Sequence, residues 1–304
     1  MSNKKLGLIA AIGVAGTLAA FYNSELLSVA LLAVGRNRGC NLQGAWPSLT
    51  VAKAQGAIEE SLRAQSRLLK RDLGAGLELW DTPSGAYWVP AGSAGAAFYD
   101  LSEQRRGIYN PAGLGVRAGD VVLDCGANIG TYSKTALAAG ASKVLAIEPV
   151  PQNLECLRRN LSAEIAAGKV VLVEKGVWNK DDQLSINLDP KNQAGASFVG
   201  THGGKVNTLL LPLTTIDAIV EETGLSRVDF IKMDIEGAER QALAGGRKTI
   251  SRFHPRMAMS VYHLEDDTTV IPSLALSYWS GYQRECGPCR PGEGRLNAEV
   301  YLFY

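Results

Sequence analysis

Residues 121–130 have the sequence Val-Val-Leu-Asp-Cys-Gly-Ala-Asn-Ile-Gly, from which the rest of the chain can be interpreted. An apolar run that closes on an acidic residue, followed by small residues at alternate positions, predicts a buried strand turning sharply into a helix. Gly126 and Gly130 allow the backbone to approach a ligand closely. Residues 131–140 predict a short helix that ends in glycine. Its first turn leaves N–H donors beside the loop, an arrangement typical of a nucleotide-binding site.

The next predicted strand, residues 143–149, helps to choose between two nucleotide ligands. It ends at Glu148, where doubly wound folds place a carboxylate that accepts hydrogen bonds from ribose hydroxyls, and both NAD and S-adenosylmethionine (SAM) carry such a ribose. A pyrophosphate binder has Gly-x-Gly-x-x-Gly, whereas this loop has Asp-x-Gly-x-Asn-x-Gly, with Asp124 before the glycines and Asn128 between them. Asp124 would repel a pyrophosphate but suits an ammonium and a sulfonium. We therefore expect SAM rather than NAD.

A second motif lies at residues 228–239, Val-Asp-Phe-Ile-Lys-Met-Asp-Ile-Glu-Gly-Ala-Glu. Together with the loop at 121–130 it resembles the FkbM branch of class I SAM-dependent methyltransferases, whose signature is Ile-Lys-x-Asp-x-Glu-Gly. The resemblance runs from about residue 77 to the C-terminus. It implies SAM as the cofactor and a hydroxyl of a sugar, or of another small or lipid-linked molecule, as the methyl acceptor. Asn128 stands where most methyltransferases have glycine, and FkbM-type sequences share this difference.

Strand-like and helical segments alternate through the second half of the chain. The predicted strands are residues 121–125, 144–148, 170–174, 230–234 and 256–262. This order predicts an α/β fold, a Rossmann-like, doubly wound and mostly parallel sheet covered on both faces. Ligands in such folds bind beyond the C-terminal strand ends, where Asp124, Glu148, Asp234 and His263 all fall. Residues 182–213 interrupt the alternation. We expect three short antiparallel strands here, which form an insertion over the acceptor site.

Methyl transfer to a hydroxyl requires alignment of donor and acceptor and removal of a proton. Asp234 is the first candidate base, because it ends a strand beside the expected methyl position. Lys232 is expected to point the same way, to orient this carboxylate or to lower the pKa of the acceptor hydroxyl. His263 ends the next strand and can act as a base near neutral pH. The family resemblance further implies that Glu103 or Tyr109 contacts the amino-acid end of the cofactor, with a place on a helix surface as the alternative.

Metal chemistry is permitted by the sequence but not required. Asp234, Glu236 and His263 offer oxygen and nitrogen ligands for a divalent ion. Cys286 and Cys289 form a Cys-x-x-Cys pair, but the residues that follow exclude the helix of a redox tetrapeptide, and a zinc site would need further ligands. We expect these two cysteines in a loop between the last two strands, 281–285 and 298–303. Cys40 has no evident partner.

The N-terminal segment, residues 6–22, is uncharged and apolar and has nearly the length of a membrane-spanning helix. We expect residues 1–34 to form an uncleaved membrane anchor with the catalytic domain on the cytoplasmic side, because SAM is made in the cytosol. A cleaved signal peptide and a buried apolar hairpin are the alternatives. Residues 35–76 are expected to form a linker and an amphipathic helix over 48–73. Residues 77–304 are expected to form the methyltransferase domain, which starts with a β-hairpin.

Composition excludes other classes of protein. The 304 residues are 46% hydrophobic and 20% charged, with a formal net charge of +1, so the chain is globular and gives no hint of a nucleic-acid-binding patch. A membrane-tethered, non-catalytic SAM-fold module is the main alternative, and the complete set of Asp124, Glu148 and Asp234 argues against it. An NAD-dependent enzyme is disfavoured by the loop spacing. The oligomeric state is left open.

Overall fold

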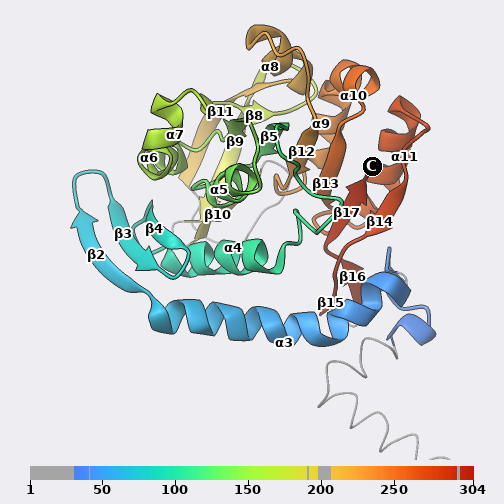
Figure 1. The fold of residues 1–304 in the computed structure, drawn as a ribbon, viewed down its shortest axis with the longest axis horizontal. Helices are drawn as coiled ribbons and strands as arrows, with labels where there is room; N and C mark the ends of the chain where they lie inside the picture. Colours follow the sequence, from blue (N-terminus) through green and yellow to red (C-terminus); the bar gives the residue numbers. More distant parts are fainter. Residues whose placement is uncertain (1–30, 41, 190–191, 198–206, 293–294) are drawn as a thin grey trace, which may run out of the picture.

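A computed structural model describes residues 31–40, 42–189, 192–197, 207–292 and 295–304 (Figure 1). Most of the expected membrane anchor, residues 1–30, lies outside these described residues. Within them, no helix combines the length and the apolar character needed to cross a membrane.

The central element is a seven-stranded sheet in the order β14-β17-β13-β12-β5-β6-β7. In chain order these strands are β5 (Val121–Cys125), β6 (Lys143–Ile147), β7 (Val170–Val173), β12 (Phe230–Met233), β13 (Arg256–Ser260), β14 (Arg284–Cys286) and β17 (Val300–Phe303). Neighbours from β7 to β13 pair in parallel, and β17 pairs antiparallel with both β13 and β14. The expected mostly parallel sheet is therefore confirmed.

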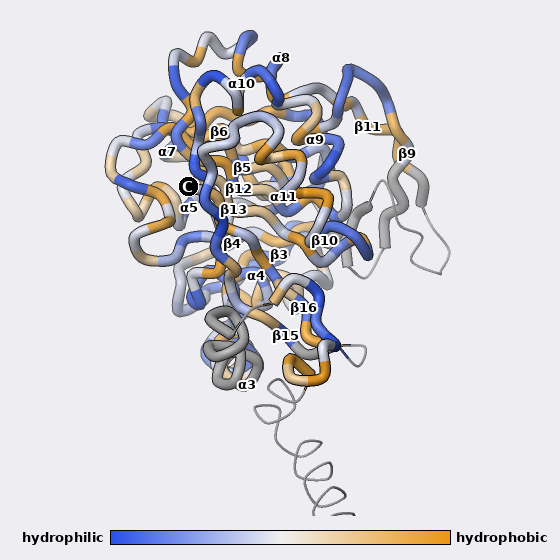
Figure 2. Tube along the Cα trace, turned by 90° about the vertical axis from the view of Figure 1, so that its right-hand side faces the viewer, coloured by the Kyte–Doolittle hydropathy of each residue, from blue (hydrophilic) through white to orange (hydrophobic). Residues whose placement is uncertain are grey.

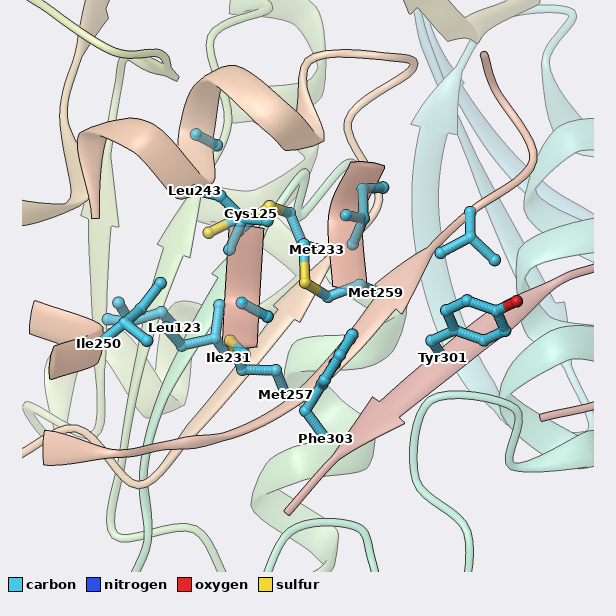
Figure 3. Packing of buried hydrophobic residues seen from close by; sticks show 14 of the residues in the cluster. Leu123, Cys125, Ile231, Met233, Leu243, Ile250, Met257, Met259, Tyr301 and Phe303 are labelled. Carbon is cyan, nitrogen blue, oxygen red and sulfur yellow. The ribbon is translucent and has the colours of Figure 1, made fainter. Parts of the chain in front are cut away.

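Alternate side chains of each strand enter two separate cores, one on each face of the sheet. Leu123, Ile231 and Met257 pack with α8 (Ile216–Glu222), α9 (Glu239–Gly245), α10 (Arg247–Phe253) and α11 (Asp267–Tyr278). Figure 3 shows part of this core, with methionine side chains beside Phe303. Val122 enters the opposite core, against α5 (Thr131–Ala138), α6 (Pro151–Asn160) and α7 (Ser162–Ala166). Burial of both faces explains the nearly continuous apolar strands.

An N-terminal layer packs onto this domain. It consists of α3 (Leu42–Gln65), β2 (Arg67–Asp72), β3 (Leu77–Thr82), β4 (Gly85–Pro90) and α4 (Ala94–Arg106). Figure 1 shows α3 and α4 running side by side below the sheet. Leu62 of α3 is fully buried in a cluster with Leu77 and Phe98.

The helix expected over residues 48–73 ends earlier than predicted, at Gln65. Residues 67–72 form a strand that pairs antiparallel with β3. Leu69, which the helical spacing placed on the apolar face, is 48% exposed. The prediction was wrong here because backbone pairing with β3, a non-local interaction, outweighs local helix periodicity. The hairpin predicted at 77–89 is confirmed as β3 and β4.

Besides the three-stranded sheet β2-β3-β4 of the N-terminal layer, two further small sheets lie outside the central one. The predicted antiparallel insertion is confirmed as β9 (Asp182–Asp189), β10 (Asn192–Ser197) and β11 (Asn207–Thr214), with β8 (Gly176–Val177) parallel to β11. Figure 2 shows β9 and β11 projecting from one side of the domain.

The second small sheet replaces the loop expected around Cys286 and Cys289. It contains β1 (Asn37–Arg38), β15 (Cys289–Gly292) and β16 (Arg295–Ala298), with β15 and β16 as a hairpin and β1 parallel to β16. A disulfide joins Cys40 to Cys289, so the expectation that Cys40 has no partner is corrected. The two cysteines are 249 positions apart, a distance at which sequence spacing gives no signal.

Candidate active site

A cavity of about 500 Å³ opens at the C-terminal edge of the parallel strands. Its walls are formed by the loop after β5, the segment after β6, the loop after β12 and the inner face of α4. Ligands of doubly wound folds bind at this edge. Of the residues proposed for the site, those that line the cavity are Glu103, Tyr109, Gly126, Asn128, Glu148, Lys232 and Asp234.

The glycine loop is shaped by contacts with the next strand connection. Gly126 has φ +79°, and a Cβ atom at this position would lie 2.0 Å from the carbonyl oxygen of Asp234. Gly130 has φ +91°, and a Cβ there would lie 3.0 Å from side-chain carbons of Leu157 and Leu161. Both glycines therefore allow close packing within the protein itself: Gly126 lets the loop after β5 lie against the loop after β12, and Gly130 lets it lie against Leu157 and Leu161.

Asp124 and Lys232 form a pair beneath the loop. Asp124 is fully buried and does not line the cavity; its Oδ2 accepts a hydrogen bond from Ser133 Oγ at 2.7 Å, and its Oδ1 lies 3.5 Å from Lys232 Nζ. Lys232 Nζ also donates to the carbonyl oxygen of Gly126 at 2.8 Å. Burial alone would lower the pKa of Lys232, but the carboxylates of Asp124 and Asp234 outweigh burial and raise it. The pair thus holds the loop in shape.

Glu148 lies at the end of β6, as expected for a ribose-binding acid. Its Oε2 accepts from the backbone N–H of Asn128 at 3.0 Å, and its Oε1 accepts from the backbone N–H of Val150 at 3.0 Å and from Asn153 Nδ2 at 3.2 Å. Burial raises its pKa. These bonds fix the carboxylate in the cavity wall, and its oxygens retain capacity for a further donor.

Asp234 lies directly after β12 and faces the cavity. Its carboxylate accepts hydrogen bonds from Tyr109 Oη at 3.0 Å and from Ser260 Oγ at 2.8 Å. Burial raises the pKa of Asp234, but the charges of Lys232 and His263 outweigh burial and lower it below its usual value. Asp234 is therefore ionised at neutral pH and is an acceptor of hydrogen bonds or protons within the cavity.

His263 lies behind Asp234 and is not among the cavity-lining residues. Its Nδ1 lies 2.9 Å from Glu239 Oε1, and its Nε2 lies 3.6 Å from oxygens of both Asp234 and Glu236. Burial alone would lower the pKa of His263, but the three carboxylates raise it to about 10. The imidazole therefore carries a proton at neutral pH and acts as the central cation of this cluster.

One metal-binding geometry exists in this part of the site. Asp234, Glu239 and His263 each offer a ligand atom, all within 4.8 Å of one another. Glu239 thus takes the place that the sequence suggested for Glu236. A divalent ion would have to displace the proton of His263, whose single positive charge already offsets part of the negative charge of the carboxylates.

Asp100, an acidic residue of the cavity wall, was missed by the sequence interpretation, whereas Glu103 was expected near the cofactor and Glu236 was considered as a metal ligand. Asp100 and Glu103 lie one turn apart on α4, and both line the cavity. Burial, followed by the charge of Asp234, raises the pKa of Asp100 to about 7; the same two causes raise that of Glu103 well above its usual value. Burial also raises the pKa of Glu236 to about 7. Asp100 lies three residues before Glu103, so on a helix the two side chains share one face, and this spacing could have identified Asp100 from the sequence.

The sheet order with its antiparallel β17, the glycine loop after β5 and the acid after β6 together define a class I SAM-dependent methyltransferase. The residues present fit this cofactor. Glu148 lies after β6, at the strand end where doubly wound folds place a ribose-binding acid, and the other carboxylates of the wall suit the ammonium and sulfonium charges of SAM.

Within this class, the chain belongs to the FkbM methyltransferase family: the family model for the methyltransferase FkbM domain matches residues 124–285. It is 30% identical over 184 residues to the 31-O-demethyl-FK506 methyltransferase FkbM of Streptomyces tacrolimicus, covering 52% of this chain and 70% of the relative. It is 28% identical over 126 residues to the hexuronic acid methyltransferase AglP of Haloferax volcanii, covering 41% of this chain and 49% of the relative.

The fold is also found in a solved structure. The crystal structure of the FkbM methyltransferase from Methylobacillus flagellatus KT matches with a TM-score of 0.51 and 20% sequence identity, over 88% of this chain and 62% of that one. At this identity the match concerns the fold alone.

Proposed function

We propose that this methyltransferase transfers a methyl group from SAM to a hydroxyl of a sugar, a glycolipid or another small molecule. The observation that carries the proposal is the ionised carboxylate of Asp234 in the cavity wall, held by Tyr109 and Ser260. The name of the Streptomyces tacrolimicus relative, which describes a 31-O-demethyl-FK506 substrate, supports a hydroxyl acceptor.

Bound SAM supplies an electrophilic methyl group on a sulfonium, and the protein positions the acceptor and removes its proton. Asp234 is ionised and accepts a hydrogen bond from the acceptor hydroxyl, then its proton. A carboxylate with a lowered pKa is a weak base, so a neighbouring group of higher pKa is needed to retain the proton. Glu236 and Asp100 are such groups, because the pKa of each is raised to about 7.

Lys232 and His263 act on Asp234 from outside the acceptor position. Lys232 Nζ is held by Asp124 and the loop carbonyls, and His263 by Glu239. Their positive charges keep Asp234 ionised. In this proposal Lys232 and His263 are therefore positioning residues, and the earlier expectation that His263 is a base is replaced by that of a fixed imidazolium.

The charge of the cavity favours certain acceptors. Its lining carboxylates are Glu59, Asp100, Glu103, Glu148, Asp234 and Glu236. Among the described lining residues, Lys232 is the single lysine or arginine, and its charge is directed to Asp124. An anionic acceptor would be repelled by the ionised Asp234 and would find no positive partner among the other carboxylates, several of which already have raised pKa values. We therefore infer that the acceptor is a neutral or cationic polyhydroxylated molecule rather than an anion such as a hexuronate.

The proposal includes a membrane location. The support is the uncharged apolar run at residues 6–22, with the catalytic domain placed on the cytoplasmic side, where SAM is available. Sedimentation of the full chain with membranes through a carbonate wash tests this, and recovery of the chain in the supernatant would contradict it.

The function is tested in two stages with the full chain. Calorimetric titration with SAM, S-adenosylhomocysteine and NAD should show binding of the two adenosyl ligands alone. Transfer of radiolabelled methyl is then measured with neutral sugars, amino sugars, glycolipids and uronates as acceptors. Asp234→Asn should retain SAM binding and lose turnover, whereas the exposed Asp81→Asn, a matched control, should retain both. Binding of NAD alone would contradict the cofactor, and an active Asp234→Asn would exclude Asp234 as the base.

A further inference from the structure

Three cysteine side chains meet at one point outside the active-site cavity. Cys40 lies just before α3, Cys286 ends β14 and Cys289 begins β15. Their Sγ atoms all lie within 4.8 Å of one another. Cys40 and Cys289 form a disulfide, and the Sγ of Cys286 lies 3.7 Å from that of Cys289. The proposed methyl transfer does not use this cluster.

The arrangement has the features of a thiolate metal site. Zinc binds cysteine sulfur at about 2.3 Å in tetrahedral geometry, which places neighbouring ligand sulfurs about 3.8 Å apart. The spacing between Cys286 and Cys289 matches this value. A Cys-x-x-Cys pair supplies two ligands of many zinc sites, and the fold brings Cys40 in as the third.

The backbone around the cluster is built to hold these ligands. The β15–β16 hairpin carries Cys289, and β1, which precedes Cys40, pairs with β16. Tyr301 Oη donates to the carbonyl oxygen of Gly39 at 2.9 Å, and a Cβ atom at Gly39 would lie 1.9 Å from that hydroxyl. Figure 1 shows this small sheet beside the N-terminal part of α3.

Burial of the three residues is uneven. Cys289 is fully buried and Cys286 is 8% exposed, whereas Cys40 is only partly buried. Cys40 is therefore the member of the cluster with the most contact with solvent. A site with three protein ligands and one solvent-facing position can complete its tetrahedron with water.

We propose that the reduced chain binds one Zn²⁺ through Cys40, Cys286 and Cys289, and that the Cys40–Cys289 disulfide is the oxidised, metal-free form of the same site. A dithiol reductant gives two electrons and two protons to the disulfide and itself becomes a disulfide. The three thiols then release three protons as their sulfurs bind zinc. Oxidation of Cys40 and Cys289 by a disulfide oxidant re-forms their disulfide, reduces the oxidant to a dithiol and releases the zinc ion.

The site would fasten the start of α3 to the edge of the catalytic domain. Arg290 follows Cys289 directly, and its guanidinium donates to Tyr99 Oη at 2.9 Å. Tyr99 lines the active-site cavity on α4. Both the disulfide and the zinc form therefore keep the N-terminal layer in place over the cavity, in oxidising and in reducing surroundings respectively.

The experiment uses the full chain, reduced without oxygen and equilibrated with Zn²⁺. Elemental analysis should find one zinc per chain, released in step with blocking of the three thiols. Co²⁺ in place of Zn²⁺ should give the sulfur-to-cobalt absorption of a tetrahedral thiolate site. Cys40→Ser and Cys286→Ser should each weaken zinc binding by more than about 100-fold, because even outer-shell partners contribute up to that factor. Cys156→Ala is the matched control, since Cys156 is buried in a different cluster.

Two results would overturn the proposed zinc site. One is a reduced chain that shows neither bound zinc nor thiolate–cobalt absorption, and the other is zinc binding that survives both serine substitutions. The wild-type cobalt spectrum does not depend on whether a variant folds, so the test remains decisive. SAM binding is measured on the same samples, and its loss would concern the methyltransferase assignment and not the cysteine site.

Discussion

Substitution of Gly126 by alanine is the most direct test of the loop geometry. At φ +79° an L-residue loses about 1–2 kcal/mol. The added Cβ would also lie 2.0 Å from the carbonyl oxygen of Asp234, so the loop or that carbonyl has to move by about 1 Å or more. Overpacking of this kind costs about 1–3 kcal/mol. We expect the free energy of unfolding to fall by about 2–5 kcal/mol, and turnover by about 100-fold because Asp234 is displaced.

Gly113→Ala is the matched control for this prediction. Gly113 has φ +86°, close to that of Gly126, but a Cβ there meets no heavy atom within 4 Å. It should therefore cost only the conformational 1–2 kcal/mol, with turnover unchanged. Urea denaturation measures the free energy of unfolding, and methyl transfer and SAM titration measure the site. Equal losses of stability in the two variants, with normal turnover in Gly126→Ala, would refute the proposed contact.

Three further predictions follow from buried charges. Glu148→Ala should weaken SAM binding about 10- to 100-fold in calorimetry, because a charged hydrogen-bond acceptor is lost, and unchanged affinity would exclude Glu148 from the cofactor site. Arg106→Met should lower the free energy of unfolding by about 3 kcal/mol, measured by urea denaturation. The reason is that the Glu299 carboxylate, which lies 2.6 Å from Arg106 and is 4% exposed, stays buried without its main partner. A loss below about 1 kcal/mol would contradict this prediction. The pKa of His263 rises from 6.5 to about 10 on folding, so its stabilising effect is complete below pH 6.5 and is lost as the pH approaches 10. The stability difference between wild type and Glu239→Gln should shrink over that pH range, and a constant difference would argue against the imidazolium.

The α/β architecture and the location of the site can be predicted from the sequence alone. Runs such as residues 121–125 and 230–233 are apolar because both faces of their sheet are buried, and this pattern is local and visible in any one segment. The carboxyl ends of parallel strands meet at one edge of a sheet, so the sequence alone predicts that Glu148 and Asp234 lie in one site, and both line the cavity.

The partners and charge states of these groups follow from the three-dimensional arrangement and not from the sequence. Asp124 and Lys232 form a buried ion pair beneath the loop, and His263 is held as a cation by Glu239. The pairing of Cys40 with Cys289 likewise joins segments that are far apart in the chain. Protonation states and partners of this kind depend on burial and on charges from other elements, which act through space and leave no period or spacing in the sequence.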